Sequence, residues 1–337
     1  MPPQKVLCRQ LPGTMERLYH KTFFCDTMAR MKEIVFAPLE GIGNHIYRNA
    51  WRRHYGGVTR FMTPFLDLNS VGGMKNRGIA DILPENNEGA VIIPQVLTDS
   101  PKALTAAAEK LAGYGYAEVN LNLGCPVGTV TGKGRGSAML KDAEKLRRFL
   151  DEAYETCPIP LSLKTRIGFE SAEEAGALFE LFNDYPVKEL TVHPRLRSEF
   201  YTGPIHADVL DMVCRESKNP VCVNPGITTA EEFAAAINRW PEASAVMIGR
   251  GLIADPALAE KCTAVESNDG RARFLSFHDD LLESYQAILF GETPVLFKMK
   301  ELWSYWSVPF GMDEKTLKRI KKARSVSEYR SILAMYT

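Results

Sequence analysis

The feature that most constrains the fold is an alternation of short apolar runs with longer helical patterns between residue 33 and about residue 259. The candidate strands are residues 34–37, 59–64, 91–95, 118–122, 161–165, 189–193, 221–224 and 245–248. Helical patterns lie between them, for example at residues 102–114, 142–154, 172–183, 230–238 and 256–261. Three of these helices follow a capping residue, namely Ser100, Ser171 or Thr229. Eight strands, each followed by a helix or a long loop, predict an α/β fold of the (β/α)₈ barrel type.

The competing architecture is a doubly wound parallel sheet. It would carry a Gly-x-Gly-x-x-Gly turn after an early strand, and Gly41-Ile42-Gly43 lacks the third glycine. After about residue 265 only helical spacing of apolar residues remains. We therefore predict an N-terminal extension (1–32) that is dispensable or poorly ordered, a barrel domain (33–262) and a smaller all-helical domain (271–337).

The charge and cysteine content narrow the partners and the compartment. Formal net charge is zero, so any attraction to nucleic acid must come from a local patch. Seven cysteines, an odd number without a CxxC spacing, favour a reducing cytoplasm over a disulfide framework or a zinc site. No apolar run is long enough to span a membrane. We expect a cytoplasmic monomer without a metal.

A basic stretch near the C-terminus supplies one such patch. Residues 315–324 hold six basic residues in ten and no acidic residue. At helical spacing, four of them share one face: Lys315, Lys318, Arg319 and Lys322. The face could contact phosphates or could simply be solvated.

The loop after the fourth strand carries the residue of most chemical interest, Cys125. The strand ends in Asn-Leu-Asn-Leu-Gly-Cys-Pro, and residues 127–137 then contain four glycines together with Lys133 and Arg135. Glycine-rich composition predicts a mobile loop. A thiol presented there could act as a nucleophile or as an acid, and the alternative is a buried small hydrophobic residue.

Polar, charged or glycine residues follow nearly every other predicted strand, where a (β/α)₈ barrel places its reactive groups. Glycines after the last two strands, with Arg250, predict a phosphate site, although glycines also serve tight turns. Lys164, between apolar neighbours, is expected to point into the barrel mouth. His193 fits either a ligand-facing role or a hydrogen-bonded core position.

Taken together, these motifs resemble the tRNA-dihydrouridine synthase family. The matching pieces, in order, are Ala37-Pro38-Leu39-Glu40-Gly41, Gln95, the segment 120–126 with Gly136-Ser137-Ala138, the segment 164–168, Val192-His193 and the segment 247–251. The resemblance implies an FMN-containing barrel that uses NADPH to reduce the C5=C6 bond of particular uridines in tRNA, and a helical domain that binds the RNA.

The same resemblance implies roles for individual residues. The FMN would be held by Ala37, Pro38, Leu39, Gln95, Lys164, His193, Asn224, Gly226, Gly249 and Arg250. Cys125 would protonate C5 of the uracil, so its thiol pKa should not be strongly lowered. Asn122 and Arg166 would contact the base. The tRNA would be bound by Lys133, Arg135 and the basic face of the tail.

Two departures from the family pattern affect these assignments. Asn224-Pro225-Gly226 replaces a commoner Asn-Gly, and proline removes one backbone N–H from the phosphate site. His193-Pro194-Arg195 replaces His-Gly-Arg, which leaves the role of Arg195 open. Two other hypotheses are an FMN-dependent ene- or dihydroorotate-type reductase, which gives no reason for a basic tail, and a tRNA-binding protein that has lost its chemistry.

Overall fold

The computed structural model describes residues 32–68, 73–74, 76–263 and 270–335, and Glu33–Thr337 form one compact unit. The predicted extension, apart from Lys32, lies outside the described residues. Within those ranges the strands are β1 (Glu33–Phe36), β2 (Arg60–Met62), β3 (Leu66–Asp67), β4 (Ile92–Ile93), β5 (Gln95–Leu97), β6 (Val119–Leu123), β7 (Leu161–Gly168), β8 (Leu190–Leu196), β9 (Val221–Val223) and β10 (Ala245–Ile248). All of their pairings are parallel.

The described strands close into a barrel, which confirms the predicted fold. The pairing order is β3-β5-β6-β7-β8-β9-β10-β1-β2-β4. Pro94 alone separates β4 from β5, and three residues separate β2 from β3. β2 with β3 and β4 with β5 therefore each act as one interrupted barrel strand. These two strands pair with each other, which joins the two ends of the order. Proline has no N–H to donate, which explains why Pro64 and Pro94 interrupt the ladders. Each predicted strand coincides with one of the eight segments of this barrel.

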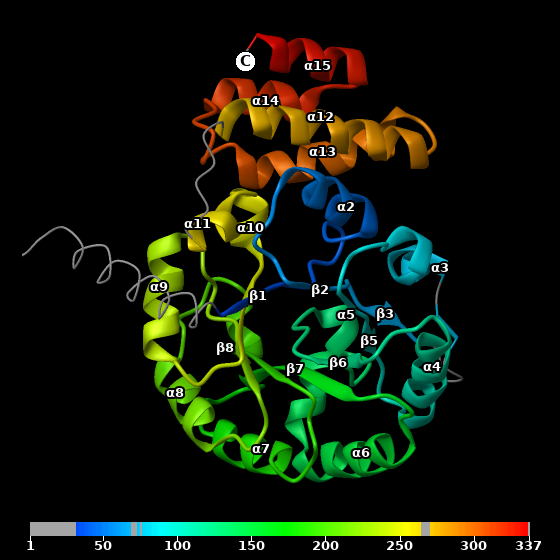
Figure 1. Cartoon of the computed structure of the whole chain (residues 1–337), viewed down its shortest axis with the longest axis vertical. Helices are drawn as coiled ribbons and strands as arrows, with labels where there is room; N and C mark the ends of the chain where they lie inside the picture. Colours follow the sequence, from blue (N-terminus) through cyan, green and yellow to red (C-terminus); the bar gives the residue numbers. More distant parts are fainter. Residues whose placement is uncertain (1–31, 69–72, 75, 264–269, 336–337) are drawn as a thin grey trace, which may run out of the picture. The chain divides into compact units, whose positions relative to one another are not determined.

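Helices lie outside the strands (Figure 1). The longer ones are α2 (His45–His54), α4 (Pro101–Gly113), α6 (Ala143–Thr156), α7 (Glu174–Phe182), α8 (Ala207–Glu216) and α9 (Ala230–Arg239). Shorter ones are α3 (Asn76–Ile79), α5 (Gly128–Thr131), α10 (Arg250–Ala254) and α11 (Leu258–Cys262).

The predicted helix caps are right at two positions. Ser100 accepts from the Ala103 N–H at 3.2 Å, and Thr229 forms a capping box with Glu232. Before α7, the Ser171 hydroxyl accepts the Glu173 N–H at 3.2 Å, one residue ahead of the helix, and the Glu174 carboxylate accepts the N–H groups of residues 169–171.

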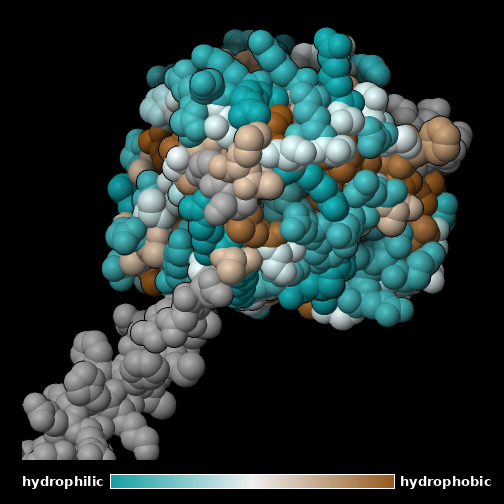
Figure 2. Space-filling view, turned by 90° about the horizontal axis from the view of Figure 1, so that it is seen from above, coloured by the Kyte–Doolittle hydropathy of each residue, from teal (hydrophilic) through white to brown (hydrophobic). Residues whose placement is uncertain are grey.

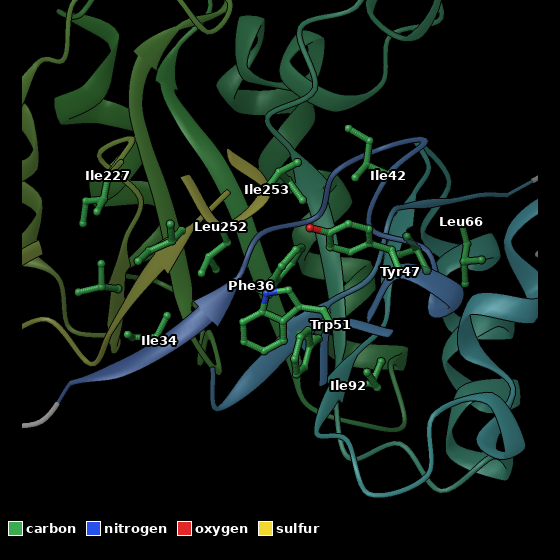
Figure 3. Packing of buried hydrophobic residues seen from close by; sticks show 14 of the residues in the cluster. Ile34, Phe36, Ile42, Tyr47, Trp51, Leu66, Ile92, Ile227, Leu252 and Ile253 are labelled. Carbon is green, nitrogen blue, oxygen red and sulfur yellow. The ribbon is translucent and has the colours of Figure 1, made fainter. Parts of the chain in front are cut away.

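Side chains along each strand point alternately out of the barrel and into it, which separates an outer from an inner apolar layer. Ile34 and Phe36 of β1 face outward and pack with Trp51 of α2 (Figure 3). Val35 and Ala37 belong to a separate cluster inside the barrel. This period of two fixes which side chains can line the interior and which are covered by helices.

The C-terminal segment is helical, as predicted: α12 (Gly270–Ile288), α13 (Glu292–Trp306), α14 (Glu314–Lys322) and α15 (Val326–Ala334). Arg53 of α2 makes a bidentate ion pair with Asp280 of α12, both distances 2.8 Å. The indole N–H of Trp306 donates to the Ile253 carbonyl at 2.8 Å. These contacts place α12 and α13 against α2 and α10.

Figure 2 shows hydrophilic side chains over most of the face it presents, with hydrophobic residues in separate groups. No helix among the described residues is long and apolar enough to cross a membrane. The five cysteines within the described ranges are free thiols.

Candidate active site

A cavity of about 990 Å³ opens where the strands end. This volume lies at the upper end of the range for small-molecule and cofactor sites. The cavity is lined by every residue that the sequence assigned to a cofactor, and by Cys125, Asn122, Arg166 and Lys133. Arg135 is absent from its lining. The structure therefore brings together residues that are spread over more than 200 positions of the chain.

Cys125 lies two residues beyond β6 and is half-buried in the cavity wall. Burial raises the pKa of its thiol, whereas the Val127 backbone N–H and the Arg166 guanidinium lower it and the Glu40 carboxylate raises it again. Burial is the largest of these causes. The thiol is thus protonated at neutral pH, which suits a proton donor better than a nucleophile.

A chain of buried amides fixes the start of the Cys125 loop. The Asn122 side-chain oxygen accepts the Gly124 and Cys125 N–H groups at 3.1 and 2.9 Å. Its nitrogen donates to the Gln95 side-chain oxygen at 2.8 Å, and the Gln95 nitrogen donates to the Asn120 side-chain oxygen at 2.8 Å. Gln95 and Asn122, which the sequence assigned to different ligands, therefore also orient one another.

The amide chain continues to the other end of the barrel. The Asn120 nitrogen donates to the Ser162 hydroxyl at 3.0 Å, and this hydroxyl donates to the Glu118 carboxylate at 2.8 Å. Because a carboxylate only accepts, Glu118 sets the direction of every hydrogen bond up to Cys125.

The loop after Cys125, which its glycines predict to be mobile, contains two short helices. Residues 128–131 form α5, and Gly136–Lys141 form a 3₁₀ helix. Arg135 donates to Asp99 and Asp67, both at 2.8 Å, and to the Leu68 carbonyl at 3.2 Å. Two carboxylates compensate its charge, so the predicted RNA contact of Arg135 has less support than that of the exposed Lys133.

Gly136 packs directly against the backbone of Cys125. It has φ +57°, and a Cβ added there would lie 2.9 Å from the Cys125 carbonyl oxygen. The same carbonyl accepts from the Ser137 N–H at 3.1 Å and from its hydroxyl at 2.8 Å. Glycine is therefore required for the return of the chain to Cys125.

Lys164 of β7 points into the cavity, as predicted. Its ammonium donates to the Asn224 side-chain oxygen at 3.1 Å, while the Asn224 nitrogen donates to the Met247 carbonyl at 2.8 Å. Burial, with a smaller effect of Arg166, lowers the pKa of Lys164 to about 8. The side chain is a fixed cation at neutral pH that loses its charge in mildly alkaline solution.

Arg166 lies on the same strand as Lys164, inside β7 rather than beyond it. Its guanidinium donates to the Gly124 and Leu196 carbonyls, both at 2.8 Å. The side chain is buried, and Gly124 immediately precedes Cys125. Arg166 thus holds a positive charge beside the thiol with little freedom to move.

His193 pairs with Arg195, which settles where its proton lies. The Arg195 guanidinium is 3.0 Å from His193 Nε2 and also donates to the Gly203 carbonyl at 2.7 Å. Since arginine only donates, Nε2 accepts and the proton resides on Nδ1. Burial and the surrounding cations, Lys164 first, hold the pKa of His193 well below its usual range. His193 is therefore neutral.

The predicted phosphate end of the cavity combines an arginine with two glycines. Arg250 is exposed, donates to the Tyr201 carbonyl at 2.8 Å and lies 5.4 Å from the centre of the Tyr201 ring. Gly226 has φ +90°, and a Cβ there would lie 3.4 Å from the Arg195 guanidinium. A Cβ on Gly249 would meet Ala37 at 3.3 Å.

Some cavity residues were not identified from the sequence. Tyr201 stacks on His193 at 6.1 Å between ring centres and lies 5.3 Å from the Arg166 guanidinium carbon. Residues Glu301, Ser304 and Tyr305 of α13 also line the cavity. An aromatic residue eight positions after a histidine at a strand end does not by itself indicate a binding site. The helical spacing of α13 likewise does not reveal which of its faces meets the barrel.

The four basic residues of the tail, Lys315, Lys318, Arg319 and Lys322, are exposed on α14, outside the cavity. Lys318 makes a surface ion pair with Glu314 at 3.2 Å. Among the described residues, no group of three or more His, Cys, Asp or Glu side chains could hold a metal ion.

Comparison with known proteins agrees with this arrangement. The tRNA-dihydrouridine(16) synthase of Aquipseudomonas alcaligenes is 29% identical over 248 residues, which cover 70% of this chain and 77% of that protein. A probable tRNA-dihydrouridine synthase of Rickettsia conorii is 26% identical over 266 residues, covering 77% and 80%. A solved structure of a morphinone reductase variant has a TM-score of 0.50 and 11% identity, covers 72% of this chain and 90% of that one, and supports the barrel fold alone.

The family model described as dihydrouridine synthase matches residues 35–289, from within β1 to the end of α12. That span is well over half of the chain. The chain therefore belongs to the dihydrouridine synthase family, whose members are flavin-dependent oxidoreductases.

Proposed function

We propose that this protein is a tRNA-dihydrouridine synthase that uses FMN and NADPH to reduce the C5=C6 bond of particular uridines in tRNA. The observation that carries the proposal is the meeting of a protonated thiol, Cys125, and a fixed ammonium, Lys164, in one cavity of a family member. The relatives named above, which match most of the chain, are tRNA-dihydrouridine synthases.

The cavity residues fit FMN. The side chains of Ala37, Pro38 and Leu39 would offer an apolar wall for a flat ring, and the amides of Gln95 and Asn224 would offer polar contacts. The arginine fork and the glycine backbone at the other end suit a phosphate, with Arg250, Gly226 and Gly249 in that role. Pro225 removes one N–H from this end, so Gly226 would supply the backbone contact there.

When bound, FMN would accept a hydride from NADPH and deliver it to C6 of the uracil. The two electrons enter the C5=C6 bond, and the base then needs a proton at C5. Cys125 donates this proton from Sγ and becomes a thiolate, which solvent reprotonates. Arg166 lies close enough to stabilise the thiolate and is held by two carbonyls, so it needs no rearrangement.

The remaining residues position the reactants. Lys164 would hold a positive charge in the part of the cavity that would bind the flavin ring, and so would favour the reduced, anionic form of the cofactor. The neutral His193 can donate from Nδ1 to an acceptor on the bound cofactor. Asn122 orients Cys125 by accepting its backbone N–H, and because Asn122 lines the cavity its side-chain amide would also contact the base.

A uridine reaches such a cavity only after it leaves its base stack. Lys133 at the rim and the basic face of α14 would bind tRNA phosphates. A cytoplasmic location and a monomeric state belong to the same proposal.

The direct test uses tRNA that lacks dihydrouridine, isolated from a strain without its synthases. Incubation with the full chain, FMN and NADPH should yield dihydrouridine at defined positions, detected by mass spectrometry of nuclease digests. Absence of dihydrouridine while the flavin is still reduced by NADPH would refute the proposed substrate.

A further inference from the structure

One face of α13 forms part of the cavity wall and continues beyond it. Glu301 and Ser304 line the cavity from this helix. With 3.6 residues per turn, Phe297 projects between these two residues when the helix is viewed along its axis. It lies four residues before Glu301, ~6 Å towards the start of the helix. Phe297 is therefore on the face that borders the cavity, just outside it.

Phe297 is 72% exposed. Its neighbours Leu296 and Met299 are buried in the core. A single exposed hydrophobic residue needs no explanation. The exposed aromatic side chains among the described residues are, however, few: Phe200, Tyr201, Phe290 and Phe297. Of these, Tyr201 lines the cavity and Phe297 borders it.

Helix α13, which carries Phe297, is in contact with α14. Lys300, on the other flank of Phe297, donates to the Ala323 carbonyl directly after α14. That helix carries the exposed basic face of the tail. Phe297 thus lies between a cavity suited to a base and a helix suited to phosphates. An exposed aromatic ring near a basic helix face is surface chemistry that suits single-stranded nucleic acid.

We propose that Phe297 is a stacking platform for a nucleobase adjacent to the uridine that enters the cavity. The inference rests on the proposed function, because it requires that a tRNA uridine occupies the cavity. Extrusion of one base from a stack leaves its neighbours without a partner on one side. An exposed aromatic face one helical turn from the cavity replaces that partner without selecting the base identity.

The test compares three substitutions of Phe297 in the full-length protein. Phe297→Ala removes the ring, Phe297→Leu keeps apolar bulk without a π face, and Phe297→Trp enlarges the face. Alanine and leucine should raise KM for tRNA about 5- to 100-fold with little change in kcat, and tryptophan should keep KM near wild type. Val91→Ala is the matched control, because Val91 is 59% exposed and precedes β4 at the opposite end of the barrel.

A spectroscopic measurement separates stacking from general packing. tRNAs with 2-aminopurine on either side of the reduced uridine should show fluorescence quenching at one position with the wild type and Phe297→Trp. Quenching should be lost with Phe297→Leu. Flavin absorbance should be unchanged in all variants, since Phe297 lies outside the cavity.

Three results would overturn the proposal. These are an unchanged KM for Phe297→Ala, equal behaviour of Phe297→Leu and the wild type, or dissociation of an oligomer by Phe297→Ala in sedimentation, which would assign the ring to a subunit contact. A wild-type protein that makes no dihydrouridine refutes the proposed function instead. A wild-type protein that makes it, with Phe297→Ala unaffected, refutes only the stacking role.

Discussion

Replacing Asn122 by aspartate should reverse the hydrogen bonds that connect Cys125 to Glu118. Five links join them: Cys125 N–H to Asn122, Asn122 to Gln95, Gln95 to Asn120, Asn120 to Ser162, and Ser162 to Glu118. Aspartate still accepts from Cys125 but cannot donate to Gln95. Two oxygens would then face each other across 2.8 Å.

The structure gives a way to relieve that conflict. The amides of Gln95 and Asn120 can each turn by half a rotation, and the Ser162 hydroxyl can then donate to Asn120 instead of Glu118. The cost is the hydrogen bond to the Glu118 carboxylate, about 1.5–3 kcal/mol for a bond to a charged group. Without the reversal, additional buried oxygens would lack donors and the cost would be greater.

A double-mutant cycle of Asn122→Asp with Glu118→Gln measures the energetic coupling between the two ends of this hydrogen-bond chain. The amide introduced by this substitution can either accept from Ser162 or donate to it, so the single change should cost only ~1 kcal/mol. In the double mutant, the reversed chain finds a donor at its end, and we expect ~1–2 kcal/mol of favourable coupling in urea unfolding of the flavin-free protein. Additive effects within ~0.5 kcal/mol would refute the account of a directional chain.

Three further predictions concern charged residues. Burial lowers the pKa of Lys164 to about 8, so between pH 8 and the ordinary value of 10.5 the unfolded chain binds more protons than the folded one, and the free energy of unfolding of the wild type should rise with pH. Lys164→Met should flatten this rise, measured by urea unfolding at a series of pH values. Equal slopes in the two proteins would contradict the prediction. Arg135→Gln removes two partly buried ion pairs and should lower the free energy of unfolding by ~1–3 kcal/mol. Amide hydrogen exchange in residues 127–137 should accelerate, with Arg135→Lys intermediate. Unchanged exchange would show that these pairs do not hold the loop. Lys318→Gln with Lys322→Gln should weaken tRNA binding most at low salt and reduce the slope of log affinity against log salt by ~2, without altering the flavin spectrum; unchanged affinity would place the RNA surface elsewhere.

The barrel was predictable because its signals are local. Each strand is a short apolar run, and each ends in polar or glycine residues that have no reason to be there in a purely structural core. The ends of β7 and β8 were less predictable. These strands continue to Gly168 and Leu196, beyond the apolar runs, because they go on pairing with each other there, Arg166 with His193 and Gly168 with Leu196.

The order of the Cys125 loop depends on contacts that local sequence does not reveal. Its glycines indicate mobility, but Arg135 is held by Asp99 and Asp67, which are 36 and 68 residues away. The amide chain is similar, since its members lie on three neighbouring strands and meet only when the register is set. The contribution of α13 to the cavity follows from docking of the helices on α2, through Arg53 and Asp280 among others.

The central claim is that Cys125 donates a proton to a base in the cavity. It is tested most directly by the single-turnover rate of dihydrouridine formation with pre-reduced enzyme and saturating tRNA, for the wild type and Cys125→Ala. The account predicts that Cys125→Ala binds and reduces FMN like the wild type but forms dihydrouridine ~10²–10⁴ times more slowly. Equal rates in the two proteins would contradict the role of Cys125 as the proton donor.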